Sequence, residues 1–256
     1  MRSTERNELS SVLSKIDCIL GAFDADHPTL GLADLMRRTG LAKSTVHRLV
    51  GTLVEARLLE RDTGQFQLGI RLFELGQLVP RQRALRDAAL PFMEDLFEVT
   101  HETIQLAVRD GVEILYLEKI MGHRTVPSPS RVAGRMPLYC TAIGKAILAY
   151  SPPEVVEQVI DAGLTRRTPY TIVSPQLLRE CLAEVNRDGV AFDREEAALG
   201  LGCAAAPVFG QRHQVIAALS ISGSMCRVDP EQMASAVKTA SLSLSRVLAV
   251  GVEQRV

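Results

Sequence analysis

Long hydrophobic runs are absent from this chain. No stretch approaches the roughly 18 consecutive apolar residues that mark a membrane-spanning helix, and the N-terminal sequence MRSTERNELS lacks the apolar centre of a signal peptide. We therefore expect a cytoplasmic protein with no membrane partner.

Paired cysteines are also absent. The five cysteines are odd in number, widely scattered and never arranged as C-x-x-C; they are Cys18, Cys140, Cys181, Cys203 and Cys226. This pattern argues against a disulfide framework and against a structural zinc site. We expect no metal site in this protein.

Net charge and aromatic content are low as well. The formal net charge is −1, and aromatic residues make up 4% of the chain, with no tryptophan. No global field draws the whole molecule to nucleic acid, so any DNA affinity must come from a local cationic surface. With 46% hydrophobic and 23% charged residues over 256 positions, the composition is ordinary for a globular protein of about two domains.

The chain is organised around residues 29–68. Leu32, Leu35 and Met36 recur at helical spacing, and Gly40 is placed to end that helix in a left-handed conformation. A second helix should begin near Lys43 or Ser44, with an apolar face of Val46, Leu49, Val50 and Leu53. Two short strands then flank Asp62-Thr63-Gly64, which is hairpin chemistry. Helix, helix and hairpin in this order predict a winged helix-turn-helix.

The outward face of the two helices is polar and cationic, as a major-groove reader requires. We expect the contacts with double-stranded DNA from Arg37, Arg38, Lys43, Ser44, Thr45, His47, Arg48 and Thr52. The cations in this segment outnumber the anions, which suits phosphates. Two alternatives stay open: an ordinary solvated helix face, and a protein-docking module.

The run TGLAKSTVHRLVGTLVEARLLERD resembles the DNA-binding segment of the IclR (isocitrate lyase regulator) family of bacterial transcription factors. One departure is Arg57, which stands where that family usually has glycine. A non-glycine residue held at positive φ costs on the order of 1 kcal/mol, so the recognition helix is expected to end differently here.

The segment after the hairpin resembles a helical linker. Leu72, Leu75, Leu78 and Val79 form an apolar seam that suits pairing with a second copy. The alternative is that this seam packs only on its own chain.

From residue 90 onward the pattern predicts an α+β domain with an antiparallel sheet. A short helix is expected from Pro91 to Thr100, followed by a hairpin about Asp110-Gly111. Further helices are expected near Thr141, at 154–162, at 175–187 after a Ser174 cap, and from Asp229 to about Val250; strands are expected at 190–192, 203–209 and 215–221.

The stretch GVAFDREEAALGLGCAAAPVFG carries the chemistry of this domain. Gly200 and Gly202 permit a bend whose amide groups can hold an anion, and small residues beside Cys203 leave space. Ser220 and Ser222 point to one face of a strand. We expect a small cavity for a small polar ligand, such as an organic acid.

These residues are also compatible with a purely structural role or with catalysis. Cys203 alone is more often a small buried hydrophobe than a ligand contact, and the two serines can simply face water. The sharper alternative is an enzyme in which Cys203 and either His213 or His123 act as thiol nucleophile and base.

The same stretch resembles the C-terminal signature of the IclR family at Gly189, Asp193, Glu196, Cys203, Ala205, Val208 and Phe209, and departs from it at Ala204 and Gly210. RMPLYCTAIGKAILA is similar to the family's loop-to-helix element, with Tyr139 where histidine is common. The resemblance implies that effector contacts fall on Ala142, Ile143, Asp193, Cys203, Ser220 and Ser222.

This resemblance covers essentially the whole chain. It implies a winged helix-turn-helix in residues 1–70, a linker in 71–89 that dimerises, and a GAF-like effector-binding domain in 90–256. It implies a homodimer or homotetramer, no cofactor and no catalytic residue. The expected function is a ligand-responsive repressor of a catabolic operon, with an activator as the alternative.

Overall fold

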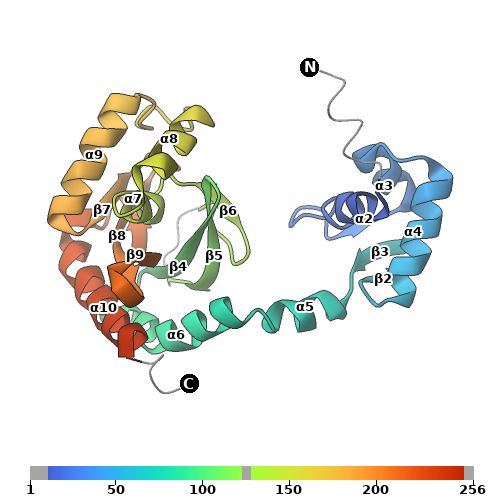
Figure 1. Ribbon diagram of the computed structural model, residues 1–256, viewed down its shortest axis with the longest axis horizontal. Helices are drawn as coiled ribbons and strands as arrows, with labels where there is room; N and C mark the ends of the chain where they lie inside the picture. Colours follow the sequence, from blue (N-terminus) through green and yellow to red (C-terminus); the bar gives the residue numbers. More distant parts are fainter. Residues whose placement is uncertain (1–10, 123–127, 251–256) are drawn as a thin grey trace. The chain divides into compact units, whose positions relative to one another are not determined.

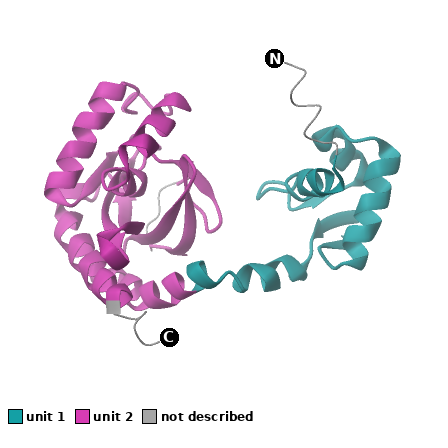
Figure 2. Ribbon diagram, in the orientation of Figure 1, with its two compact units in different colours: residues 1–83 teal, residues 84–256 magenta. Residues whose placement is uncertain are grey.

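The computed structural model describes residues 11–122 and 128–250, and the chain divides into two compact units, residues 1–83 and 84–256 (Figures 1 and 2). His123, which was considered above as a possible catalytic base, lies outside the described residues. No helix within the described residues is long and apolar enough to cross a membrane.

The first unit is a winged helix-turn-helix. Its elements are α2 (Val12–Leu20), β1 (Thr29–Leu30), α3 (Leu32–Thr39), α4 (Lys43–Glu55), β2 (Leu59–Asp62) and β3 (Gln65–Leu68). The strands pair antiparallel in the order β1-β3-β2. The expected apolar face of α4 is buried against Leu35 of α3 and Ile19 of α2, which orients the opposite face of α4 outward.

The turns of this unit follow the sequence closely. Gly40 ends α3 at φ 67°, and its amide donates to the carbonyl of Met36. Thr63 and Gly64 form the two-residue loop between β2 and β3, both at positive φ, the geometry that favours a tight hairpin. Both turn predictions are confirmed.

Arg57 adopts the left-handed conformation that glycine would favour, at φ 61°. The Leu58 amide donates to the Leu53 carbonyl and the Arg57 amide to the Val54 carbonyl, which is the Schellman pattern that closes a helix end. The expectation that α4 ends differently because of Arg57 is therefore wrong. The hydrogen bonds of the turn hold arginine in a conformation that costs on the order of 1 kcal/mol.

Two helices, α5 (Ile70–Gln77) and α6 (Pro80–Thr100), follow the wing. The prediction that a helix begins at Pro91 is wrong, because Pro91 lies inside α6. Leu85, Ala89, Met93 and Leu96 form one buried stripe on both sides of the proline. Burial of this stripe keeps the helix continuous where local propensity alone would end it.

The second unit is built on a six-stranded antiparallel sheet in the order β6-β5-β4-β9-β8-β7. Its strands are β4 (Thr103–Asp110), β5 (Glu113–Ile120), β6 (Arg135–Pro137), β7 (Ala191–Arg194), β8 (Leu201–Phe209) and β9 (Val215–Ser224). The hairpin expected at Asp110-Gly111 is confirmed as the β4–β5 turn, with Gly111 at φ 63°.

Helices cover both faces of this sheet (Figure 1). They are α6 and α10 (Pro230–Val250) on one face, and α7 (Ala142–Leu148), α8 (Pro153–Asp161) and α9 (Pro175–Asp188) on the other. Ser174 caps α9 by accepting from the Leu177 amide, as predicted. The sheet thus separates two apolar cores, and the core on the α7 side contains the cavity described below.

Candidate DNA-binding surface and effector pocket

The outward face of α4 carries most of the predicted DNA-binding residues. Lys43, Ser44, His47, Arg48 and Thr52 are exposed, whereas Thr45 is half-buried. Ala42 precedes the helix and supplies no side-chain cap. The first amide groups of this 13-residue helix therefore have no side-chain acceptor from the capping position, and such groups suit a phosphate.

The two arginines of α3 are engaged within their own unit. Arg37 donates to Asp34 at 2.6 Å. Arg38 donates to the Ala22 carbonyl and to Asp24, both at 2.8 Å, and this ion pair, followed by His27, lowers the pKa of Asp24. Arg38 therefore ties α3 to the loop after α2, so a phosphate would have to compete with these contacts.

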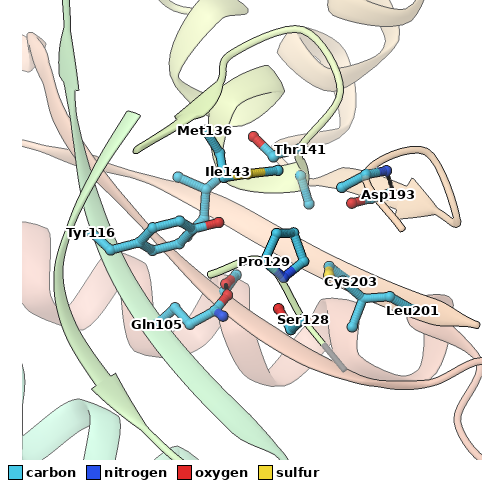
Figure 3. A pocket seen from close by; sticks show the side chains of 13 residues that line it. Gln105, Tyr116, Ser128, Pro129, Met136, Thr141, Ile143, Asp193, Leu201 and Cys203 are labelled. Carbon is cyan, nitrogen blue, oxygen red and sulfur yellow. Dashed lines mark hydrogen bonds between the residues drawn. The ribbon is translucent and has the colours of Figure 1, made fainter. Parts of the chain in front are cut away.

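The candidate effector pocket is a cavity between the sheet and α7 (Figure 3). The structure brings Ala142, Ile143, Asp193, Cys203 and Ser220 together in its lining. Ser222 is buried but is not part of this lining; its hydroxyl donates to the Thr103 carbonyl at 3.5 Å.

Further residues line the cavity that were not predicted as effector contacts. They include Gln105, Tyr116, Ser128, Pro129, Met136, Thr141, Ala197 and Leu201. A signal for Gln105 was present, since it is a lone amide in the apolar run IQLAV. Its role depends on strand order, because Gln105 of β4 pairs with Ser220 of β9 more than a hundred residues later.

The enclosed space is small, about 20 Å³, which is enough for about one water molecule. An organic acid therefore fits only when lining side chains move. Binding of a larger ligand would then be coupled to a change in the surrounding structure.

The bend between β7 and β8 holds the chain's own carboxylates. Asp193 Oδ1 accepts from the amides of Glu196 at 2.7 Å and Ala197 at 3.3 Å. The Gly200 amide donates to Glu195 Oε1 at 2.6 Å. The expected role of the Gly200 amide in holding a ligand anion is therefore wrong, because an internal carboxylate already occupies it.

A threonine pair fixes this bend from outside. Thr168 Oγ1 donates to the Glu195 carbonyl at 2.6 Å, and Thr171 Oγ1 donates to the Glu196 carbonyl at 2.8 Å. Both threonines are buried. They hold Glu195 at φ 63° and so position Asp193 beside the cavity.

Three ionisable side chains, Lys145, Glu196 and Asp193, are buried at or near the pocket. Lys145 of α7 forms a buried ion pair with Glu196, and Glu196 Oε2 is buried without a hydrogen-bond partner among the described residues. Burial, with a contribution from the nearby Glu196, raises the pKa of Asp193 to about 7. Asp193 therefore changes charge near neutral pH.

Cys203 lacks the surroundings of a nucleophile. Burial, and then the neighbouring Asp193, raise the pKa of its thiol well above the usual value, whereas reactive thiols have lowered pKa values. The His213 ring stacks on the Phe209 ring, with 4.2 Å between the ring centroids. Phe209 lies six residues along β8 from Cys203, and six residues of extended strand span roughly 20 Å. The structure does not bring Cys203 and His213 together, and within the described ranges no His, Cys, Asp or Glu cluster suits a metal.

Known proteins resemble the chain across both units. Residues 77–246 match the C-terminal domain of the bacterial transcriptional regulator IclR, and residues 15–63 match the IclR helix-turn-helix domain. The HTH-type transcriptional regulator XynR of Escherichia coli strain K12 is 34% identical over 236 residues, covering 90% of this chain and 94% of XynR. The transcriptional repressor IclR of the same strain is 31% identical over 210 residues, covering 80% of this chain and 77% of that protein.

A solved structure agrees with these sequence matches. An IclR homolog from Microbacterium hydrocarbonoxydans, complexed with 4-hydroxybenzoate, superposes with a TM-score of 0.88 at 33% identity, covering 93% of this chain and 99% of that one. The match therefore includes the helix-turn-helix and the pocket-bearing domain alike. This chain belongs to the IclR family of bacterial transcriptional regulators, in which a DNA-binding helix-turn-helix is joined to an effector-responsive domain.

Proposed function

We propose that this protein represses a catabolic operon and that a small organic acid, bound in the α7 pocket, changes its affinity for the operator. The observation that carries the proposal is the small cavity whose lining includes Asp193, Cys203 and Ser220, in a chain whose other unit is a winged helix-turn-helix. The relative complexed with 4-hydroxybenzoate supports an organic acid as the effector. The relative named a repressor supports repression as the mode of regulation.

Operator binding is assigned to the outward face of α4. Lys43 and Arg48 are exposed, and they form no ion pair within the described part of the chain, so they are free to neutralise phosphate. Ser44, Thr45, His47 and Thr52 lie along the same helix and supply groups for base edges. Arg37 and Arg38 contribute to DNA binding only at the edge of this surface, because their guanidinium groups already form contacts within the protein.

Dimerisation is assigned to residues 71–89, with the apolar seam from Leu72 to Val79 as the place where two copies join. Within α5 no side chain is buried, and Phe73 is 62% and Leu78 67% exposed. Such a run of exposed apolar side chains marks an interaction surface. A second copy would cover it, and a two-fold dimer would read two half-sites about one helical turn apart or a multiple of it.

The test is binding to the intergenic DNA beside the protein's own gene, measured by fluorescence anisotropy with and without organic acids. A repressor releases that DNA when its acid is added, and a reporter fused to the promoter is then switched on. An activator, the second candidate, would raise reporter output only when the protein is present. Affinity that does not change between low and physiological salt would contradict an electrostatic DNA surface.

A further inference from the structure

Two rows of polar side chains cross the sheet beneath the cavity. In the first row Lys119 of β5 faces Gln105 of β4, which faces Ser220 of β9. In the second row Thr103 faces Ser222, then Cys203, then Asp193 of β7. Residues directly opposite one another in antiparallel strands share a face, so both rows lie on the cavity side of the sheet.

Lys119 anchors one end of the first row. Its ammonium donates to the Ser130 carbonyl at 2.8 Å and to Ser130 Oγ at 3.1 Å. Gln105 Nε2 donates to the same Ser130 Oγ at 2.5 Å. An ammonium and an amide NH₂ can only donate, and a hydroxyl oxygen has two lone pairs. Both lone pairs of Ser130 Oγ are therefore used.

The Ser130 hydroxyl can then donate its own proton to only one neighbouring acceptor. Ser128 Oγ lies 2.8 Å away and must accept it, and it also accepts from the Ser130 amide at 3.3 Å. With its own lone pairs used, Ser128 can only donate. Ser128 lines the cavity, so its hydroxyl proton is available to a ligand.

Gln105 completes this donor end of the cavity. Its Oε1 accepts from Ser220 Oγ at 3.0 Å, which leaves the second hydrogen of Nε2 without a partner among the residues described by the structure. Gln105, Ser130 and Ser220 are all buried, so bulk water does not rearrange these bonds. The Gln105 and Ser128 side of the pocket therefore offers donors.

The opposite end of the cavity offers an acceptor. Asp193 lies on β7, three strands from Gln105 in the sheet order, or roughly 14 Å between backbones. Figure 3 shows its carboxyl on the other side of the pocket from Gln105 and Ser128, with Tyr116 as a side wall. A ligand that reaches across thus meets donors at one end and a carboxylate at the other.

We infer that the pocket selects a hydroxy-carboxylic acid, whose carboxylate accepts from Gln105 and Ser128 while its hydroxyl donates to Asp193. Lys119 is a positioning residue, because it orders the protons of Ser130 and Ser128 without lining the cavity. This inference rests on the proposed effector function and specifies the chemistry of its ligand. This orientation also explains how an acid can bind beside Asp193, because the carboxylate of the ligand points away from the Asp193 carboxylate.

Calorimetry at pH 8, where Asp193 is ionised, tests the inference with matched probes. The first set is 4-hydroxybenzoate, benzoate and 4-hydroxybenzamide; the second is 3-hydroxypropionate, propionate and 3-hydroxypropionamide. In at least one set the hydroxy acid should bind ~10-fold or more tightly than the analogue lacking the hydroxyl and the analogue lacking the charge. A bare acid or an amide that binds as tightly as the hydroxy acid in both sets would overturn the inference.

Lys119→Met tests the positioning role. It removes the ammonium and should bring the affinities for acid and amide to within a few-fold of each other, whereas Lys119→Arg should preserve the preference. Lys238→Met is the matched control, because Lys238 donates to the backbone carbonyl of Asp188 outside the pocket and should leave the preference intact. Ser128→Ala, which removes the terminal donor, should act like Lys119→Met and serves if that variant fails to fold.

DNA binding separates this inference from the function on which it rests. Release of operator DNA by bare acids or dicarboxylic acids, but not by hydroxy acids, would leave the effector function standing and overturn the hydroxy-acid assignment. If no acid alters DNA binding or thermal stability, both are overturned. An unchanged preference for acid over amide in Lys119→Met and in Ser128→Ala would reject the proton-ordering chain.

Discussion

Lys145 of α7 forms an ion pair with Glu196 of the β7–β8 bend, and both side chains are buried. The pair joins the helix that carries Ala142 and Ile143 to the bend that follows Asp193 of β7. Removing one partner leaves an uncompensated buried charge, which costs about 3–5 kcal/mol. We therefore expect Lys145→Met to lower the free energy of unfolding of the second unit by about that amount.

Urea unfolding followed by circular dichroism measures this loss. The double variant Lys145→Met, Glu196→Gln removes both charges and should recover a large part of the stability. A loss below about 1 kcal/mol in the single variant would mean that the pair behaves like an exposed one and does not hold the bend.

Asp193 should make the protein less stable as pH rises. Burial raises its pKa to about 7, whereas in the unfolded chain the carboxyl titrates near its ordinary value, about 3.9. Between these values the folded state retains a proton that the unfolded state has lost, so stability falls as pH rises from about 4 to about 7 and then levels off. Asp193→Asn should remove this component, and thermal melting at pH 5 and pH 8 compares the two proteins.

Other carboxylates contribute an opposite trend. Asp24 has a lowered pKa because of Arg38, so its contribution is lost only as pH falls toward the acid range. The diagnostic quantity is therefore the difference between wild type and Asp193→Asn. Parallel pH profiles for the two proteins would contradict the raised pKa.

Arg57 should be replaceable by glycine with a gain in stability. Its φ of 61° disfavours any residue with a Cβ, and relief of that strain is worth up to about 1 kcal/mol, less the backbone entropy that glycine loses on folding. Chemical denaturation of the first unit in Arg57→Gly measures the gain. Arg57→Val is the control and should destabilise, because a β-branched side chain suits positive φ least.

Cysteine reactivity separates a regulator from a thiol enzyme. Cys203 is buried and has a strongly raised pKa, whereas Cys226 is exposed. Iodoacetamide at neutral pH should therefore label Cys226 well before Cys203, as mass spectrometry of peptides would show. Selective early labelling of Cys203 would revive the nucleophile hypothesis.

Local chemistry made much of the fold predictable. Gly40, Thr63-Gly64 and Ser174 each carry a preference set within a few residues, and each turn or cap formed where expected. Pro91 shows the limit of such rules. Its local preference for a helix start was outweighed by the buried stripe of α6, and that stripe has meaning only once the sheet beneath it is known.

The pocket was predictable only in part, because its lining is set by cross-strand register. Asp193, Cys203 and Ser220 were predicted from the small residues and strand alternation around them and from the family resemblance, and all three line the cavity. Gln105 lies beside Ser220 through the β4–β9 pairing, which no short-range pattern reveals. Ser222 shares a face with Ser220 as expected, yet it lies two residues further along the strand and outside the lining.

The most direct test of the central claim is operator binding by wild type and by Arg48→Ala, each titrated with the hydroxy acid that binds most tightly in the calorimetric sets. The account predicts that wild type binds its intergenic DNA in a salt-dependent way and that the acid weakens this binding. It predicts that Arg48→Ala binds about 1–3 kcal/mol more weakly while retaining the acid's affinity for the pocket. DNA binding that ignores both the acid and the loss of Arg48 would contradict it.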